Sequence, residues 1–289
     1  MRGSVLGVSV WGPGLPGWHA SRPALAGLAD HEPCEVAPPA PSMLSATERR
    51  RTSLAVRLAL HAAQEACAMS GLQPGTLRAV FGTANGDGAV MHAILDSLAT
   101  GEGHVSPTQF HNSVHNAAAG YWTIGTASRQ PATCIGCHDT TAGMALLNAA
   151  AEMQVEQVPV LLCVYDLPLP EPLHAKRPVQ HGFAAALVLA PAGERALAEI
   201  EVMFSPASPA SPASPASPAS PASPASPAPA ATGEQSSLGA LARANPAARM
   251  LPLLQALAVG EPATVRMPLI EGCLDIAVTP CSTAGRSPP

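Results

Sequence analysis

A short strand pattern that runs directly into a helix pattern, at residues 131–154, constrains the fold of this chain more than any other feature. Residues 132–137 form a short apolar run with the β-branched Thr133 and Ile135, and the Ala-rich stretch from Thr140 repeats apolar residues at helical spacing. Very few residues join the two. A side chain in such an elbow lies in the field of the helix N-terminus, which favours an anion and lowers the pKa of a thiol. The elbow therefore suits a cysteine nucleophile.

Strand and helix patterns alternate on both sides of this elbow. Strands are predicted at residues 5–11, 78–83, 159–165 and 183–189. Helices are predicted at residues 47–69, where Gly71 ends the helix, and at residues 88–100 and 114–126. The strand at residues 159–165 is apolar throughout, which is typical of a strand buried on both faces. The alternation predicts an α/β fold, with a layered, mixed but mostly parallel sheet and helices on its faces.

Composition narrows the classes of function. The 289 residues, 47% hydrophobic, are enough for one sizeable core, and a net charge of -5 gives no reason to expect a nucleic acid or an anionic membrane as partner. No apolar run approaches membrane-spanning length, and residues 1–15 lack the apolar core of a secretory signal. The seven scattered cysteines do not form a disulfide framework. We expect a cytoplasmic protein.

A low-complexity segment divides the chain. Residues 205–228 are eight uninterrupted Ser-Pro-Ala triplets, and proline at every third position blocks helix and sheet, so this segment is expected to be disordered or semi-extended. We assign residues 1–191 to one domain and residues 192–237 to a linker or loop insertion. Residues 238–289 are predicted to supply a C-terminal helix and strands that complete the same domain, with a disordered end.

The segment before the elbow resembles a known family. Residues 106–131, SPTQFHNSVHNAAAGYWTIGTASRQP, together with the elbow are similar to the N-terminal half of a β-ketoacyl synthase of the thiolase fold. In that family an Asn-x-x-Ala-Gly helix, an Arg-Gly-Pro turn and a buried strand lead into the catalytic cysteine. The residues that fit are Asn116, Ala119, Gly120, Arg129 and Pro131. Counted without gaps from Pro131, the position of the cysteine falls on Asp139, and Cys137 lies two residues earlier.

Further motifs in the same order resemble the β-ketoacyl synthase-like N-terminal domain family. They are an opening strand followed by GPGLP, then SVHNAAAGYWTI, HDTT, YDLPLPEPL and GFAAALVLA. The likeness covers residues 5–191 plus a degenerate tail, and it implies a thiolase-like half. Proteins of this family are associated with aryl polyene and related pigment pathways and are often labelled chain length factors.

The resemblance also shows what this chain lacks. A ketosynthase decarboxylates its malonyl donor with two histidines and a lysine from its C-terminal half, and no histidine or lysine follows Pro191. A carboxylate at Asp139 cannot form the thioester that condensation requires. The resemblance therefore implies a non-condensing, chain length factor-type subunit without a cofactor. It would form a heterodimer with a full-length β-ketoacyl synthase and work with an acyl carrier protein in fatty acid or polyketide biosynthesis.

Two other interpretations stay open. One is an enzyme, either a stand-alone acyltransferase or a cut-down 3-oxoacyl synthase, that uses Cys137 as nucleophile with His138 or His115 as base. The other is a degenerate paralogue without function. The segment CIGCH, residues 134–138, also has the C-x-x-C-H pattern of haem attachment and a zinc-like spacing. Residues three apart on a strand point to opposite faces, so we expect no metal there.

Each candidate site residue has an ordinary structural interpretation beside the functional one. Asp139 is expected to be the N-cap of the helix that follows it, and Ser113 the cap of the helix before the elbow. His111 and His115 suggest a triad with Asp166, yet nothing in the spacing sets a geometry. In the resembling synthases this region lies near the acyl pocket and the dimer partner. We take as pocket or interface candidates His111, His115, Asn116, His138 and Thr140.

Overall fold

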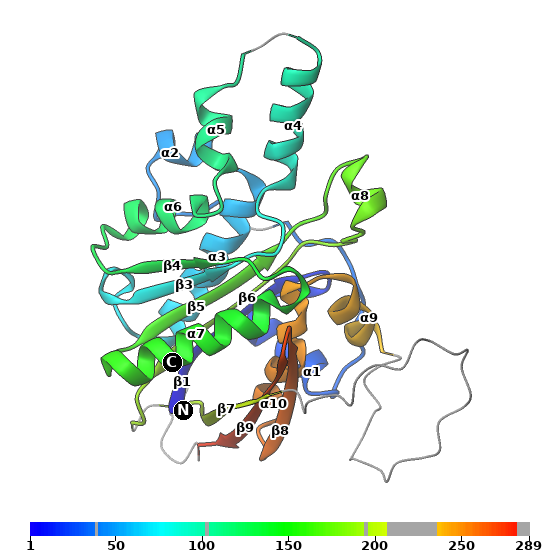
Figure 1. Ribbon diagram of the computed structural model, residues 1–289. Coiled ribbons are helices and arrows are strands. Elements are labelled where there is room, and N and C mark those ends of the chain that lie inside the picture. The colour runs from blue at the N-terminus through cyan, green and yellow to red at the C-terminus, as the bar shows by residue number, and fades with distance from the viewer. Residues whose placement is uncertain (38–39, 102–103, 194–195, 207–235, 282–289) are drawn as a thin grey trace, which may run out of the picture.

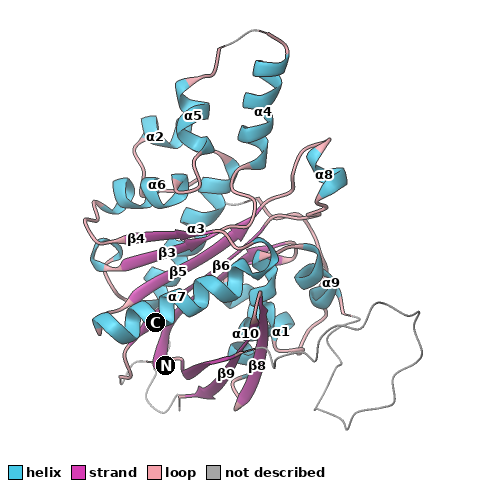
Figure 2. Cartoon of the chain, in the orientation of Figure 1, coloured by secondary structure: helices cyan, strands magenta, loops and turns pink. Residues whose placement is uncertain are grey.

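The structure is a computed structural model that describes residues 1–37, 40–101, 104–193, 196–206 and 236–281. The described strands form one sheet with helices on its faces (Figures 1 and 2). The strands are β1 (Arg2–Gly12), β2 (Leu15–Pro16), β3 (Arg78–Gly82), β4 (Ala132–Ile135), β5 (Val160–Asp166), β6 (Phe183–Ala190), β7 (Ala198–Ser205), β8 (Ala263–Leu269) and β9 (Gly272–Pro280). The helices are α1 (Trp18–Leu25), α2 (Ala46–Arg51), α3 (Leu54–Ser70), α4 (Gly88–Ala99), α5 (Pro107–Ser113), α6 (Ala117–Thr126), α7 (Thr141–Glu156), α8 (Leu173–Lys176), α9 (Ser237–Ala244) and α10 (Leu251–Val259). Short 3-10 helices lie at η1 (Pro74–Thr76), η2 (His138–Thr140) and η3 (Ala247–Met250).

The strand order is β4-β3-β5-β6-β1-β7-β9-β8, with β2 paired to β1. Strand β3 runs parallel to β4 and to β5, and the other pairings between described strands are antiparallel. The predicted layered, mixed α/β sheet is confirmed, but the expectation that most strands run parallel is wrong. Parallel neighbours need a long crossover connection, usually a helix. Between β5 and β6 the chain forms only the four-residue α8, and β8 turns directly into β9.

Strand β5 separates two hydrophobic clusters, one on each face of the sheet. Its Val160, Leu162 and Val164 face the cluster that contains α7 and α10, whereas Leu161 and Cys163 face the cluster that contains α3 and α6. Every residue of β5 is buried. This two-sided burial explains the continuous apolar run in the sequence.

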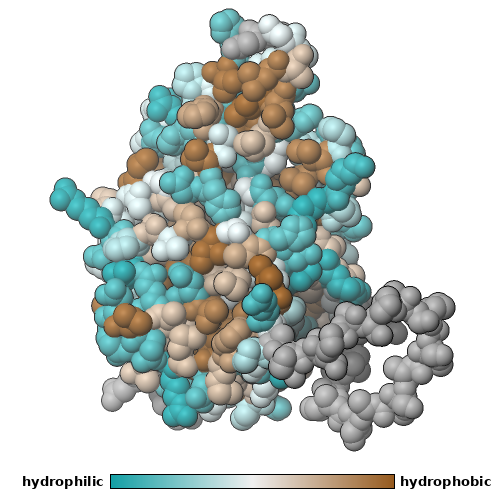
Figure 3. Space-filling model, viewed as in Figure 1, coloured by the Kyte–Doolittle hydropathy of each residue, from teal (hydrophilic) through white to brown (hydrophobic). Residues whose placement is uncertain are grey.

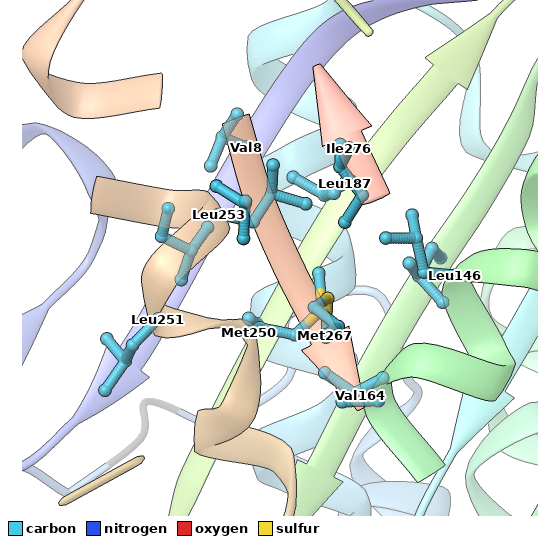
Figure 4. Close-up of a cluster of buried hydrophobic side chains, with 14 of the residues drawn as sticks. Val8, Leu146, Val164, Leu187, Met250, Leu251, Leu253, Met267 and Ile276 are labelled. Atoms are coloured by element: carbon cyan, nitrogen blue, oxygen red, sulfur yellow. The ribbon is translucent and has the colours of Figure 1, made fainter. Parts of the chain in front are cut away.

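The segments on either side of the Ser-Pro-Ala repeat belong to one core. Strand β7 pairs with β9, and Figure 4 shows Leu253 of α10 and Ile276 of β9 packed against Val8 of β1 and Leu146 of α7. The assignment of residues 192–237 to a linker is therefore wrong for β7. Strand β7 alternates buried apolar residues with half-buried glutamates and ends at Ser205, the first residue of the repeat, so the low-complexity composition that follows favoured a linker over a strand. The predicted disorder after Pro206 and at the C-terminal end lies outside the described residues.

The helix predicted at residues 47–69 is divided into α2 and α3. The Thr52 hydroxyl donates a hydrogen bond to the carbonyl of Arg49 (2.7 Å), and Ser53 caps α3 by accepting from the amide of Val56. Such side-chain bonds to the local backbone compete with a continuous helix. Gly71, at a left-handed φ of 70°, ends α3 as predicted. None of the described helices combines the length and the apolar character needed to cross a membrane.

Candidate functional site

The predicted elbow between strand and helix is present at the edge of the sheet where β3, β4 and β5 end. Strand β4 stops at Ile135, the 3-10 turn η2 follows, and α7 begins at Thr141. His138 has a left-handed φ of 50°, a conformation that is uncommon for a residue with a side chain and that often marks functional sites. The apex of the elbow is therefore His138, one residue before Asp139.

Asp139 lies between two arginines. Its Oδ1 accepts a hydrogen bond from Nη2 of Arg177 (2.8 Å), and its Oδ2 lies 3.2 Å from Nη2 of Arg249. Partial burial raises the pKa of this carboxyl, but the hydrogen bond and charge of Arg177, with the charge of Arg249, outweigh it and hold the pKa below its ordinary value. Asp139 is therefore an ionised, paired carboxylate at neutral pH.

The expectation that Asp139 caps the following helix is wrong. Helix α7 has Thr140 as its N-cap residue, and Asp139 belongs to the preceding turn η2. The two guanidinium groups come from the chain after α8 and from η3, and they draw the carboxylate away from the helix amides. Charge pairing with distant segments therefore replaces the local capping bond.

Arg177 connects three segments around the elbow. Besides Asp139, its Nε donates to Oδ1 of Asn85 (2.6 Å) and its Nη1 lies 2.7 Å from Nε2 of His138. Because a guanidinium has only donors, Nε2 of His138 must accept this bond. The Nδ1 of His138, 3.5 Å from the Asp139 carboxylate, then carries the proton. Arg177 thus fixes the orientation and the tautomer of His138.

Asp166, the last residue of β5, fixes the loop that carries Asn85. Its Oδ1 accepts hydrogen bonds from the Thr83 hydroxyl (2.9 Å) and from the amides of Ala84 and Asn85. Burial raises the pKa of Asp166 to about 6, although these hydrogen bonds act in the opposite direction. Asp166 and the histidines do not form a triad, because Nε2 of His115 bonds instead to the carbonyl of Thr83 (3.0 Å).

The structure brings only some of the candidate residues to the elbow. The His115 ring packs on Gly136, where an added Cβ would lie 2.7 Å from Nε2 of His115. The Thr140 hydroxyl donates to the carbonyl of Cys137 (2.8 Å). His111 lies apart in α5, with its ring edge-on to Tyr121. Helix α5 was not predicted.

The cap of α6 also differs from the prediction. Asn116 is the N-cap residue of α6, whereas Ser113 is the last residue of α5 and bonds to the carbonyl of Phe110. The chain before α6 makes its own short helix instead of extending the later one. Ser113 therefore does not cap α6.

The two cysteines of CIGCH lie on different elements. Cys134 is in β4, and burial raises the pKa of its thiol. Cys137 is half-buried in the turn after β4, and its amide donates to the Thr141 hydroxyl. Within the described ranges, no group of three or more His, Cys, Asp or Glu side chains is arranged to hold a metal ion.

Sequence reasoning missed the residues that organise the elbow, which are Arg177, Arg249 and Asn85. Arg177 lies 38 residues after Asp139, and nothing local in the sequence pairs the two. The one available signal was the cationic pair Lys176-Arg177 directly after the motif YDLPLPEPL.

Comparison with known proteins agrees with this architecture. The chain is similar to the complex of ketosynthase ApeO with its chain length factor ApeC from Xenorhabdus doucetiae, at a TM-score of 0.66 and 18% identity over 96% of this chain and 99% of that chain. It is also similar to the ishigamide ketosynthase/chain length factor, at a TM-score of 0.65 and 16% identity over 96% and 99% of the two chains.

A third similar structure is AntDE:AntF, described as a type II polyketide synthase acyl-carrier protein in complex with its ketosynthase, at a TM-score of 0.66 and 11% identity over 97% and 99%. These likenesses establish the thiolase-like fold. No curated protein matches the sequence. The family model for the β-ketoacyl synthase N-terminal domain, however, matches residues 20–232. The chain therefore belongs to the β-ketoacyl synthase family, through the N-terminal domain of that family.

Proposed function

We propose that this chain is a non-condensing subunit of chain length factor type that pairs with a full-length β-ketoacyl synthase in polyketide or fatty acid biosynthesis of the aryl polyene type. The observation that carries the proposal is Asp139, the residue at the expected nucleophile position, held as an ionised carboxylate by Arg177 and Arg249. A paired carboxylate cannot form the thioester intermediate of a condensation. The absence of histidine and lysine after Pro191 supports the same conclusion.

An open apolar surface on α4 and α5 supports the pairing. Helix α4, GAVMHAILDSLA, buries only Gly88. Leu95 and Leu98 are 51% and 54% exposed, and Phe110 of α5 is 66% exposed. Figure 3 shows this apolar surface at the end of the molecule where α4 projects. Apolar surface with few charges is typical of the centre of a protein interface, and we assign it to the ketosynthase partner.

The contacts at the elbow also bear on the alternative that this chain is an enzyme with Cys137 as its nucleophile. A base for Cys137 needs a free imidazole nitrogen within reach of the thiol. The lone pair on Nε2 of His138 accepts from Arg177, and Nε2 of His115 must donate to the Thr83 carbonyl. Each of these Nε2 atoms is therefore engaged elsewhere, and within the described residues no hydrogen bond links either imidazole to the Cys137 thiol.

Acylation tests the proposal directly. We expect no adduct on Cys137 when the purified chain is incubated with acyl carrier protein thioesters or with a cysteine-directed ketosynthase inhibitor, as measured by intact-protein and peptide mass spectrometry. A Cys137→Ala variant is the control for labelling at the other cysteines. An adduct on native Cys137 would overturn the non-condensing assignment.

The Asp139→Cys variant tests the register of the elbow. A thiol placed beside Arg177 and Arg249 should have a lowered pKa and react with the inhibitor faster than Cys137 does. The variant should still not condense malonyl and acyl thioesters, because residues 192–289 contain no histidine or lysine to decarboxylate the malonyl donor. An introduced thiol no more reactive than that of an exposed cysteine such as Cys34 would argue that the nucleophile position lies elsewhere.

Pairing is measured by co-expression with a full-length β-ketoacyl synthase from the same organism. The expected result is a one-to-one complex in native mass spectrometry. A chain that purifies alone, or only as a homodimer, beside each such synthase would contradict the proposed partner.

A further inference from the structure

A pocket of about 420 Å³ opens on the face of the sheet that α3 covers. The buried part of its lining is the indole of Trp11, near the end of β1, and the side chain of Leu58 in α3. Val36, Leu54 and Leu167 line the part that is open to solvent. None of the described residues that line this pocket belongs to the elbow.

The apolar lining contains a leucine that the chain itself leaves uncovered. Leu54 is 54% exposed, although Leu58, one turn later on the same side of α3, is 2% exposed. A ligand in the pocket would cover Leu54, and removing apolar surface from water is favourable. A concave, mostly apolar pocket with a few polar groups is typical of small-molecule sites.

Three polar side chains complete the lining, and they are Glu35, Gln180 and His181. Within the described part of the chain, none of these three side chains has a hydrogen bond or an ion pair. Their polar atoms are therefore available to a ligand. The indole N–H of Trp11 instead donates to the carbonyl of Val36 (3.2 Å), so this ring offers the pocket an apolar surface.

The charge of the lining distinguishes between possible head groups of a ligand. Glu35 is the one carboxylate among the lining residues, and these include no lysine or arginine. The ring of His61 lies edge-on to Trp11, with centroids 4.5 Å apart, and burial lowers its pKa, so it is uncharged at neutral pH. An anionic head group would meet Glu35 with no cation to offset the repulsion. An ammonium or hydroxyl group can donate to the carboxylate.

We propose that this pocket binds a small amphiphile with an apolar or aromatic body and a head group that donates hydrogen bonds, an amine or an alcohol. The body packs on Trp11, Leu54 and Leu58, and the head group lies near Glu35. Aromatic ligands suit an indole surface, because aromatic pairs gain energy beyond the area that they bury. The site does not involve the elbow, α4 or α5, so it is independent of the proposed pairing with a ketosynthase.

Three ligands with one body and different head groups test the proposal. They are 4-phenylbutylamine, 4-phenylbutanol and 4-phenylbutanoate, which are cationic, neutral and anionic at pH 7. Binding to the nitrogen-15-labelled full chain is followed by the indole N–H signals in nuclear magnetic resonance. The three tryptophans, Trp11, Trp18 and Trp122, are assigned with single Trp→Phe variants. Trp122 lies in α6 and does not line the pocket, so it is the internal reference.

We expect the amine and the alcohol to shift the Trp11 signal saturably, with a Kd of about 1 mM or below, as is typical for ligands of this size. The Trp122 signal should not move. The butanoate should bind about three- to tenfold more weakly than the amine, because an exposed carboxylate attracts or repels a charge only modestly. No saturable shift at Trp11, an equal shift at Trp122, or equal binding of amine and butanoate would overturn the proposal.

Glu35→Gln isolates the head-group contact. It should weaken binding of the amine about two- to fivefold and strengthen binding of the butanoate, with little change for the alcohol. Glu32→Gln is the matched control, because Glu32 lies in the same loop but does not line the pocket. This control removes the same charge from the chain and should leave the preference for the amine intact. A preference that survives Glu35→Gln, or that Glu32→Gln also removes, would contradict the placement of the head group.

Leu54→Gln tests the apolar side of the pocket without adding a charge. Leu54 is exposed in the free chain, so the variant should fold, which circular dichroism checks. All three ligands should bind about three- to fivefold more weakly, because less apolar surface is covered. Unchanged binding in the folded variant would show that the body of the ligand does not lie in this pocket.

Discussion

Helices α4 and α7 are both rich in apolar residues but are opposite in burial. Helix α7 contains Glu152 and Glu156, whereas α4 contains a single charged residue, Asp96. Yet α7 buries eight residues and α4 only Gly88. The more apolar helix is therefore the more exposed one. The chain completes its own core around α7 and leaves α4 with the surface that a partner would cover.

The positions of the two helices account for this difference. Helix α7 packs against β3, β5 and β8 of the sheet, so closely that a Cβ on Gly143 would meet the Leu269 side chain at 2.7 Å. Helix α4 projects from the sheet edge beside α5 (Figure 1). Its base is the loop that Asp166 holds through Thr83, Ala84 and Asn85. Asp166 is thus the junction between the buried and the open region.

The largest expected effect lies in α7. Leu146→Ala should lower the free energy of unfolding by about 2 to 5 kcal/mol, because Leu146 is fully buried and its removal leaves a cavity. Urea unfolding followed by circular dichroism measures it. A loss under about 1 kcal/mol would mean that α7 is less tightly packed than the structure shows.

Asp166 should make the free energy of unfolding depend on pH. Its pKa is about 6 in the folded chain against 3.8 for the ordinary carboxyl, so between those values the folded state binds more protons than the unfolded state. The contribution of Asp166 to stability is therefore complete below about pH 4 and falls as the pH rises to about 6, by about 3 kcal/mol.

The Asp166→Asn variant isolates this contribution. The difference in unfolding free energy between variant and native chain should change across pH 4 to 7, since the other carboxylates cancel in the difference. A difference that is constant with pH would show that Asp166 titrates normally.

The open surface of α4 should matter for pairing and not for folding. Replacing Leu95 and Leu98 by Asp should weaken binding to a ketosynthase at least about tenfold, because the charges would be buried at the interface. The isolated chain should stay within about 0.5 kcal/mol of native stability. Val155→Asp at the end of α7, where Val155 is 77% exposed, is the control. Equal binding by both variants would place the partner elsewhere.

The smallest effect on the free energy of unfolding is expected for a Leu-to-Ala substitution in α4, which corresponds to Leu146→Ala in α7. Leu95→Ala should change the unfolding free energy of the isolated chain by less than about 0.5 kcal/mol, because Leu95 is about half exposed. Leu146→Ala makes the same chemical change in α7. A comparable loss at both sites would erase the distinction between the two helices.

Local patterns determined the elements themselves. The β-branched run before Ala-rich sequence predicted β4 and α7, continuous apolar runs predicted β5 and β6, and Gly71 marked the end of α3. These features depend on interactions between residues close in sequence, so the spacing of apolar residues along the chain predicts them. The family motifs likewise lie in continuous segments.

Tertiary structure alone decided strand direction, the exposure of α4 and the state of Asp139. Apolar periodicity shows that a helix has an apolar face, but the elements that cover this face lie elsewhere in the chain. Arg177 and Arg249 reach Asp139 only because α8 and η3 pack at the same edge of the sheet. Ion pairing and burial between residues far apart in the sequence depend on how distant segments pack together. No local pattern in the sequence predicts this packing.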